Sequence, residues 1–190
     1  MARHLEFDRM EVLTKAVDAF WQVGYEALPA LDIATAMGVA KSSLYNTFGS
    51  KRKLFIESVD HYAAMQRATL TPAAKSANVM AVLRQMLLEI ASDNNAGRGC
   101  LLVNTAAEFG AHDDEIRQHV RAGFGSIKDV FAHLIQAGQA AGQIKPSIDP
   151  HQHAMILVTG IAGLRVLKKG GFTSTDLNPV IENMLAGLTQ

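Results

Sequence analysis

Apolar side chains recur every three or four residues along almost the whole chain, and strict alternation of apolar and polar residues is scarce. This spacing matches the period of an α-helix, so it predicts amphipathic helices rather than strands. The first clear example joins Leu13, Ala16, Phe20 and Val23, and it is followed by Gly24. Because glycine is typical of helix C-termini, the pattern predicts a helix that ends at about residue 24.

Glycine, proline and asparagine positions divide the rest of the chain into further helices. Two short ones are expected over Pro29–Met37 and Lys41–Phe48, with Gly38 in the turn between them. Longer helices are expected over Lys51 to about Leu70, Asn78–Asp93, Cys100–Phe109, Asp113–Ala141, Pro150–Lys168 and Leu177–Leu188. The fold class predicted is all-α, with a three-helix N-terminal module and a larger C-terminal helical body. We place the division between residues 1–52 and 53–190.

Composition limits what this helical protein does. The chain has 190 residues, in which eighteen Lys and Arg balance eighteen Asp and Glu. A protein that is basic overall is therefore excluded, and any affinity for nucleic acid must come from local clustering. One cysteine excludes an internal disulfide and a Cys-cluster zinc site. Charged residues near the N-terminus argue against a secretory leader peptide. The most apolar stretch, Ala154 to Leu164, is too short for a membrane span. We therefore expect a cytoplasmic protein.

The two short helices together form a buried apolar seam, and the second one also has an outward polar face. The residues expected to pack against Phe20 of the first helix are Ile33, Ala34, Met37, Val39, Leu44 and Phe48. The residues left facing outward are Lys41, Ser42, Ser43, Tyr45, Asn46 and Thr47. Two short helices joined by a glycine turn form a helix-turn-helix, whose second helix enters the DNA major groove.

Positive charge gathers beside that helix. Between Val39 and Lys53 there are four basic residues, Lys41, Lys51, Arg52 and Lys53, and no acidic residue. The last three begin a helix, where the macrodipole disfavours cations by about 0.3–1 kcal/mol each. A DNA phosphate at this position would remove the conflict. The cluster therefore predicts DNA contact, and the alternative is a solvated lysine-rich turn.

The order and spacing of these residues resembles the DNA-binding domain of TetR/AcrR-family transcriptional regulators over about Val12 to Phe55. The matching residues are Gly24-Tyr25, Ile33-Ala34, Gly38-Val39, Ser43-Leu44-Tyr45, Phe48 and Ser50-Lys51. The resemblance implies a dimeric repressor whose partner is a double-stranded operator DNA and whose C-terminal domain binds an unknown small-molecule inducer. It also implies phosphate contacts from Tyr45 and Lys51.

The candidate DNA contacts are Lys41, Ser42, Ser43, Tyr45, Asn46, Thr47 and Lys51. The chain departs from the family pattern at three places. Leu28-Pro29 replaces a common Thr-Ser, Thr47 replaces a common aromatic residue, and Gly49 replaces a common proline. These departures affect individual contacts and leave the class of protein unchanged.

The two C-terminal helices are expected to form a homodimer interface. Pro150–Lys168 is apolar nearly all round, so it must be covered on both sides. Gly160 and Gly163 would let a partner helix approach closely. Leu177–Leu188 also repeats apolar residues at helical spacing. Together the two helices predict half of a four-helix interface, in agreement with the resemblance, and the alternative is a central helix of a monomer.

The inducer is expected among the apolar faces of the body helices. The candidate contacts are Met86, Ile90, Cys100, Val103, Asn104, Phe124, Ile127, Phe131 and Thr159. Glu108 is a further polar candidate. Stripes of methionine and aromatic residues at helical spacing belong to the packed core more often than to a ligand pocket, so the alternative that these residues only pack the core stays open.

Cys100 supports a second hypothesis. It stands at the expected start of a helix beside Arg98, and both features favour a reactive thiolate. The stretch from Gly99 to Asn104 resembles the regulatory domain of one branch of the family, in which some members respond to electrophiles or oxidants through a cysteine. The alternative is a small buried hydrophobe.

Neither a metal nor an enzymatic site is indicated. His151 and His153 are two residues apart and would point to different faces of a helix. His112 with the acids that follow it is typical of a helix start. The sequence contains no glycine-rich phosphate loop, nucleophile elbow or HExxH motif. We therefore expect no cofactor, no metal and no catalysis.

Overall fold

A computed structural model describes residues 8–76, 78–92 and 97–189 of the chain. Within these ranges the regular structure is helical throughout, which confirms the all-α fold class. The N-terminal helices are α1 (Arg9–Val23), α2 (Ala30–Met37), α3 (Lys41–Phe48) and α4 (Lys51–Leu70), and α4 leads into a 3-10 turn, η1 (Thr71–Lys75). The other helices are α5 (Val79–Ser92), α6 (Leu101–Phe109), α7 (Asp114–Ala140), α8 (Pro150–Lys169) and α9 (Ser174–Ala186).

Most helix bounds lie within one or two residues of the expected ones, and the following points stand out. Pro29 is the N-cap of α2 rather than its first residue. The turn η1 was not expected. The last helix begins at Ser174, three residues before Leu177. The expected end of α5 at Asp93 lies outside the described residues.

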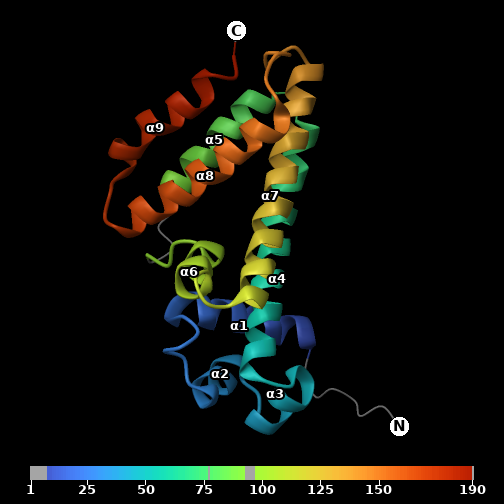
Figure 1. Cartoon of the computed structure of the whole chain (residues 1–190), viewed down its shortest axis with the longest axis vertical. Coiled ribbons are helices and arrows are strands. Elements are labelled where there is room, and N and C mark those ends of the chain that lie inside the picture. Colours follow the sequence, from blue (N-terminus) through green and yellow to red (C-terminus); the bar gives the residue numbers. More distant parts are fainter. Residues whose placement is uncertain (1–7, 77, 93–96, 190) are drawn as a thin grey trace.

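The molecule is elongated, with the helix-turn-helix module at one end (Figure 1). Helices α4 and α7 run side by side along the long axis and pack against each other. Helices α5, α8 and α9 gather around the far end of α7, and α6 lies at the waist between the two ends. No described helix is long and apolar enough to cross a membrane.

Two hydrophobic clusters hold these helices together. The first joins α1–α4 to α6 and to the first turns of α7, through residues such as Leu102 and Phe109. The second joins α5, α7, α8 and α9. Phe124 and Ile127 of α7 pack against both clusters. Because α4 continues unbroken from the module into the body, the expected division at residues 52 and 53 falls inside a helix.

The helix-turn-helix is built as the apolar pattern indicated. Side chains of the expected seam are buried around Phe20, and Val39 packs against them while half-buried. Gly38 closes α2 with φ of 70°, the left-handed region, and its N–H donates to the carbonyls of Ala34 and Thr35. This turn sets α3 across α2 and leaves the outer face of α3 in solvent.

Candidate DNA-binding surface and central cavity

Helix α3 presents its polar face at the end of the molecule. Lys41, Ser42 and Asn46 are exposed, whereas Tyr45 is half-buried. Ser43 and Thr47 are also half-buried, and the Thr47 hydroxyl donates to the Ser43 carbonyl at 2.9 Å. The outermost side chains are therefore a cation, a hydroxyl and an amide, which are suited to phosphate and base edges.

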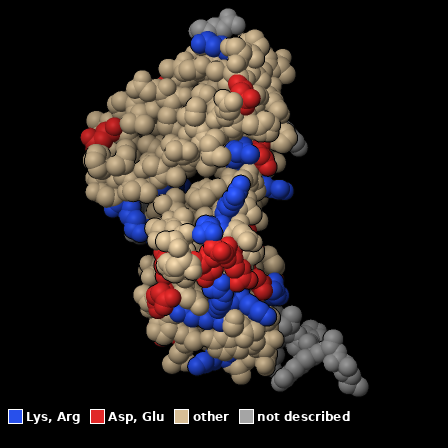
Figure 2. All heavy atoms as spheres, viewed as in Figure 1, with Lys and Arg blue, Asp and Glu red and all other residues tan. Residues whose placement is uncertain are grey.

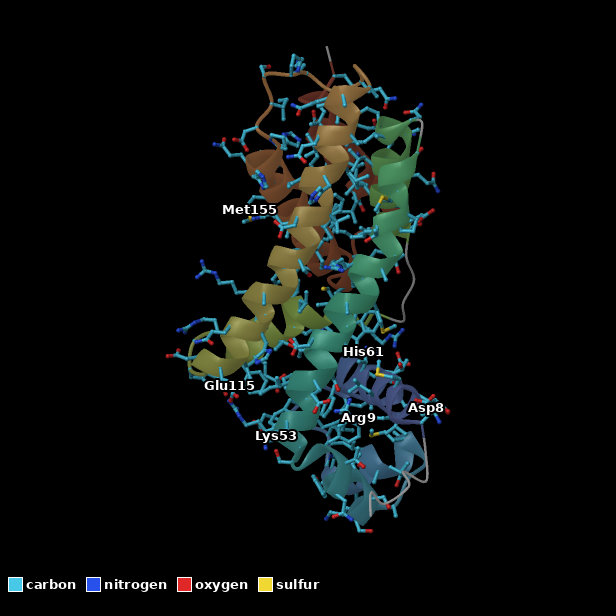
Figure 3. All side chains as sticks on the ribbon, turned by 90° about the vertical axis from the view of Figure 1, so that its right-hand side faces the viewer. Asp8, Arg9, Lys53, His61, Glu115 and Met155 are labelled. Atoms are coloured by element: carbon cyan, nitrogen blue, oxygen red, sulfur yellow. The ribbon has the colours of Figure 1, made fainter. Side chains whose placement is uncertain are left out.

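The first turn of α4 lies next to α3. Ser50 caps this turn and accepts a hydrogen bond from the Lys53 N–H at 3.1 Å. The Lys51 ammonium lies 4.4 Å from the centre of the Tyr25 ring, a cation–π contact. Lys53 is exposed and points away from the helix axis (Figure 3). We call Lys41, Lys51 and Lys53 the basic edge.

Arg52 was counted with these cations, but the structure turns it toward the body. Its Nη1 and Nη2 donate to the Asp113 carboxylate at 2.5 and 2.9 Å, and Nη2 also reaches Glu115 at 2.7 Å. The hydrogen bonds from Arg52 hold the pKa of Asp113 far below its usual range. Acidic side chains adjoin Lys and Arg side chains at mid-height on the molecular surface (Figure 2). The basic edge is accordingly smaller than the sequence count implied.

A second contact joins the module to the body through Tyr25. The Glu108 carboxylate accepts hydrogen bonds from the backbone N–H groups of Tyr25, at 3.4 Å, and Glu26, at 3.0 Å. The Tyr25 ring packs 4.8 Å from Phe55 and 5.3 Å from Phe109, between ring centres. Burial raises the pKa of the Tyr25 hydroxyl. Glu108 therefore contributes to the contact between module and body, a role that the sequence did not indicate.

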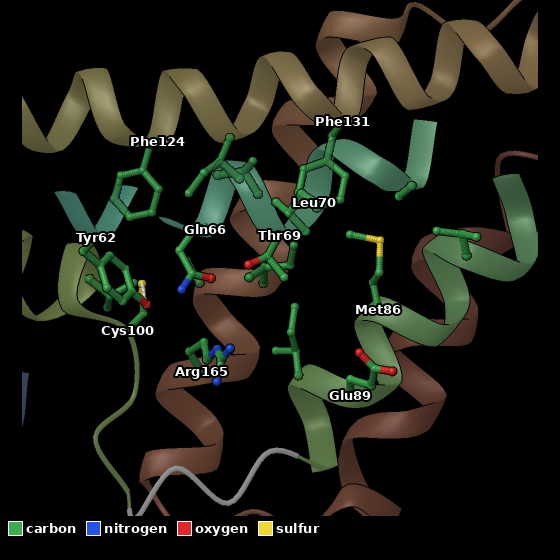
Figure 4. Close-up of a pocket in the computed structure, with 18 of the residues that line it drawn as sticks. Tyr62, Gln66, Thr69, Leu70, Met86, Glu89, Cys100, Phe124, Phe131 and Arg165 are labelled. Carbon is green, nitrogen blue, oxygen red and sulfur yellow. Dashed lines mark hydrogen bonds between the residues drawn. The ribbon is translucent and has the colours of Figure 1, made fainter. Parts of the chain in front are cut away.

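The body encloses a cavity of about 530 Å³, which we call the central cavity. Helices α4–α8 supply its walls (Figure 4). Seven of the nine candidate contacts line it: Met86, Ile90, Cys100, Val103, Phe124, Ile127 and Phe131. Asn104 is outside the lining and hydrogen-bonds the Arg98 carbonyl and Lys169, and Thr159 is exposed on α8. Cavities of this size hold small ligands, so contact with an inducer stays a prediction for the seven.

Sequence reasoning missed the polar lining of the cavity. Tyr62, Gln66 and Thr69 come from the part of α4 that was assigned to the body but not to the inducer site, and Arg165 comes from α8, which was assigned to the interface. The side chains of Tyr62, Gln66 and Arg165 lie at the same end as Cys100 (Figure 4). Helix packing brings these residues together, and no spacing in the sequence reports it.

Cys100 is the N-cap of α6, at the helix start that the sequence predicted, and its thiol has a neighbour that was not expected. The Tyr62 hydroxyl donates to its Sγ at 3.6 Å. Burial, and after it the neighbouring thiol, raises the pKa of Tyr62. The Arg98 guanidinium lies 4.1 Å from the centre of the Trp21 ring and donates to Asp18 at 3.0 Å. The Arg98 guanidinium thus contacts α1, and an influence of Arg98 on the thiol stays a prediction.

An exposed apolar face runs over α8 and α9. Met155 and Ile156 are 53% and 52% exposed, and Val166 and Val180 are 53% and 44% exposed. Met155 points out into solvent (Figure 3), and this side of the molecule carries few charges (Figure 2). A Cβ at Gly160 would meet the Met184 side chain of the same chain, so this glycine accommodates α9 rather than a partner helix. The apolar side of α8 is thus only half covered within one chain.

Among the described residues, no group of three or more His, Cys, Asp or Glu side chains is arranged to hold a metal ion. The fold and the surface of α3 instead define a class: an all-helical DNA-binding regulator with an N-terminal helix-turn-helix. Residues 12–57 match the family described as bacterial regulatory proteins, tetR family, and residues 77–169 match the tetracyclin repressor-like C-terminal domain. The chain belongs to the TetR family of transcriptional regulators, which bind DNA and are not enzymes.

Relatives of known sequence and structure agree with this assignment. The HTH-type transcriptional regulator YezE of Bacillus subtilis is 28% identical over 76% of this chain and 76% of its own length. The HTH-type transcriptional repressor ComR of Escherichia coli is 28% identical over 87% and 81%. A cysteine mutant of the TetR-family regulator CifR, complexed with a 26-bp operator DNA, is 30% identical over 98% of this chain and 100% of its own, with a TM-score of 0.77. The reduced form of E. coli NemR, 17% identical over 96% and 97%, has the same fold with a TM-score of 0.85.

Proposed function

We propose that this protein is a homodimeric repressor that binds a palindromic operator in the cytoplasm and releases it when a small molecule enters the central cavity. Residues 1–52 would supply the DNA-reading domain, and residues 53–190 would supply the inducer site and the dimer contact. The observation that carries the proposal is the coexistence of two features: a solvent-facing α3 beside a basic edge, and a cavity bounded by the helix that begins at that edge.

The DNA contacts proposed are the outward residues of α3 and the first turn of α4. Lys41, Ser42 and Asn46 are exposed, and Lys51 and Lys53 lie in the first turn of a helix, a favourable place for a phosphate. The repressor role is supported by the similarity to ComR, which is a transcriptional repressor, and the operator partner by the DNA complex of CifR.

Dimerisation is proposed through α8 and α9. Two copies of the exposed apolar face would cover Met155, Ile156 and Val180 from water, and a two-fold axis would place two α3 helices on successive major grooves. Half-sites then lie about 34–36 Å apart, or a multiple of that distance. A small tilt of α4 in each subunit would change this separation and release the DNA.

Selection of bound sequences from a random DNA pool tests the proposal. A palindromic consensus is expected, and recovery of no enriched sequence would contradict it.

With the selected site, Lys51→Ala should weaken binding and lower the slope of log Kd against log salt by about 0.9, the loss of one phosphate contact. Tyr45→Phe should weaken binding while folding normally. Lys15→Ala, a change on α1 where Lys15 pairs with Glu11, is the matched control and should leave both quantities unchanged.

A second candidate function is redox sensing through Cys100, which is favoured by the position of its thiol on the cavity wall beside Tyr62. With hydrogen peroxide, the thiolate would attack one oxygen, the O–O bond would break, and a sulfenic acid and hydroxide would form. Mass spectrometry after mild oxidation should then show one added oxygen on Cys100. A Cys100→Ser variant that the native inducer still releases from DNA would exclude the thiol mechanism.

A further inference from the structure

We propose that Tyr25 and Glu108 are positioning residues for the phosphate contact of Lys51. In this arrangement the Tyr25 ring holds the Lys51 ammonium at the basic edge, and the Glu108 carboxylate of the body holds Tyr25 in place. Neither Tyr25 nor Glu108 needs to touch the DNA. The proposal rests on the proposed function, since it takes a DNA phosphate as the ligand of Lys51.

The Lys51 ammonium is held by an aromatic ring. Its Nζ lies 4.4 Å from the centre of the Tyr25 ring. The face of a ring attracts a cation but carries no net charge, so the ammonium keeps its own charge for a phosphate. Arg52, the next residue, shows the alternative, because its guanidinium pairs with the carboxylates of Asp113 and Glu115. Tyr25 therefore restrains a cation without neutralising it.

The Tyr25 ring is itself fixed by aromatic neighbours from both halves of the molecule. Its centre lies 4.8 Å from that of Phe55 on α4 and 5.3 Å from that of Phe109 on α6. Phe55 and Phe109 are both buried. Because side chains of a close-packed core keep defined rotamers, these two rings give Tyr25, and with it the Lys51 ammonium, a defined position.

The backbone beside the Tyr25 ring is held by a carboxylate of the body. Gly24 ends α1 with φ of 89°, and the N–H groups of the next two residues, Tyr25 and Glu26, donate to Glu108 at 3.4 and 3.0 Å. Glu108 is half-buried and lies 83 residues from Tyr25 in the chain. Hydrogen bonds to an ionised acceptor are stronger than those between neutral groups. The place of Lys51 thus depends on a residue outside the helix-turn-helix.

Restraint of this kind matters for lysine in particular. Its side chain is long and flexible, so immobilising the ammonium on a phosphate opposes binding through lost conformational entropy. A side chain that is already held in the free protein loses less freedom when the DNA arrives. The Tyr25 ring should therefore strengthen operator binding through Lys51 alone.

The test uses the full chain and the operator recovered from the random DNA pool, with Kd measured at one fixed salt concentration. Tyr25→Met removes the ring but keeps an apolar side chain. It should weaken operator binding about three- to fivefold, the effect of one cation–π contact. Tyr25→Phe keeps the ring and should retain most of the affinity.

A double-mutant cycle with Lys51→Ala separates positioning from a general loosening of the module. The ammonium is absent in the Lys51→Ala background, so Tyr25→Met should change Kd there by less than about 1.5-fold. A purely structural effect would weaken binding equally in both backgrounds. Thermal unfolding verifies the fold of each variant, and Tyr25→Leu takes the place of Tyr25→Met in the cycle if the methionine variant does not fold.

Glu108 is tested in the same way. Glu108→Ala leaves two backbone N–H groups without their acceptor and should weaken operator binding about two- to threefold, again only with Lys51 in place. Glu108→Gln keeps one carbonyl oxygen and should give an intermediate Kd. Asp129→Ala is the matched control, because Asp129 is an exposed acid of the body that pairs with Lys128, and it should leave Kd unchanged.

Nuclear magnetic resonance of the free protein supplies a readout without DNA. Protons above the face of an aromatic ring are shifted upfield by its ring current. The ε-methylene protons of Lys51 should therefore resonate upfield of those of the exposed Lys41. This upfield shift should disappear in Tyr25→Met, persist in Tyr25→Phe and shrink in Glu108→Ala.

Four results would overturn the proposal. They are an effect of Tyr25→Met that is absent or equal in both Lys51 backgrounds, a loss in Tyr25→Phe as large as in Tyr25→Met, an unchanged Kd in Glu108→Ala, and Lys51 protons without an upfield shift. Any of these together with an enriched operator leaves the regulator standing and removes the positioning role. A DNA pool without an enriched sequence contradicts the proposed function itself, and the positioning role then falls with it.

Discussion

Arg52 shows how one residue in a run of cations takes a different role from its neighbours. Lys51 and Lys53 belong to the proposed DNA contacts, but Arg52 is directed to Asp113 and Glu115 at the start of α7. The sequence identified those acids as a helix start, and Asp113 is indeed the N-cap of α7, accepting from the Ile116 N–H at 3.0 Å. The second partner of Asp113 is Arg52, which is 61 residues away in the chain. Patterns of neighbouring residues in the sequence cannot predict such a pair.

This pair predicts a pH-dependent effect of Arg52→Gln. Because the pKa of Asp113 is lowered in the folded state, the stabilisation is complete above its ordinary value of 3.8 and disappears as the pH falls toward the lower folded value. The urea midpoint of the variant should lie below that of the natural chain at pH 7, and the gap should shrink at pH 3. A gap that stays constant between the two pH values would contradict the assignment.

Gly38 gives a second prediction at the residue scale. A Cβ there would meet nothing within 4 Å, but the φ of 70° is strained for other residues, so Gly38→Ala should lower the free energy of unfolding by about 1 kcal/mol. Gly125 also has open space around it and lies inside α7. Because alanine favours the helix more than glycine does, Gly125→Ala should raise the free energy of unfolding by up to about 1 kcal/mol. Urea unfolding measures both, and an equal change in the two variants would refute the conformational argument.

At the scale of the element, sequence reasoning succeeded where the information is local. The spacing of Phe20, Ile33 and Leu44 and the turn at Gly38 predicted the helix-turn-helix, because each contact lies within a short stretch. It failed for the lining of the central cavity, since Gln66 and Arg165 meet only through the packing of α4 and α8. Contact of any lining residue with an inducer stays a prediction.

The start of α9 was missed for a different reason. Apolar periodicity pointed to Leu177, but Thr173 and Asp176 form a capping box that starts the helix at Ser174. The signal was present in the sequence as a threonine followed three residues later by an acid, a recognised start pattern. Periodicity alone overlooks the first turn, because that turn exposes polar side chains.

The capping box predicts a measurable difference between two neighbouring threonines. Thr173→Ala should lower the free energy of unfolding by about 1 kcal/mol, because the Asp176 N–H loses its acceptor and the Asp176 carboxylate keeps only the backbone N–H of residue 173 as a donor. Thr175→Ala, at an exposed position in the first turn, should change it by less than about 0.5 kcal/mol. Thermal or urea unfolding distinguishes them, and equal effects would mean that the box contributes nothing.

At the scale of the whole molecule, the exposed face of α8 and α9 predicts the oligomeric state. Ile156→Glu places a charge in the proposed interface and should shift the protein to a monomer in sedimentation experiments. Operator binding should weaken with it, because one α3 reads only one half-site. Met65→Glu alters a 40% exposed residue on α4 and is the control, which should remain a dimer. A monomeric natural chain would contradict the proposal.

The continuity of α4 constrains how such regulators can be recombined. A chimera joined after residue 52 would separate Arg52 from Asp113 and Glu115, and it would leave the backbone of Tyr25 without Glu108. The first hydrophobic cluster shows which segments belong with the DNA-reading head: α1–α4, α6 and the first turns of α7. A graft that exchanges these segments as one set keeps the contacts of Arg52 and Tyr25 with the body, whereas an exchange of residues 1–52 alone loses them.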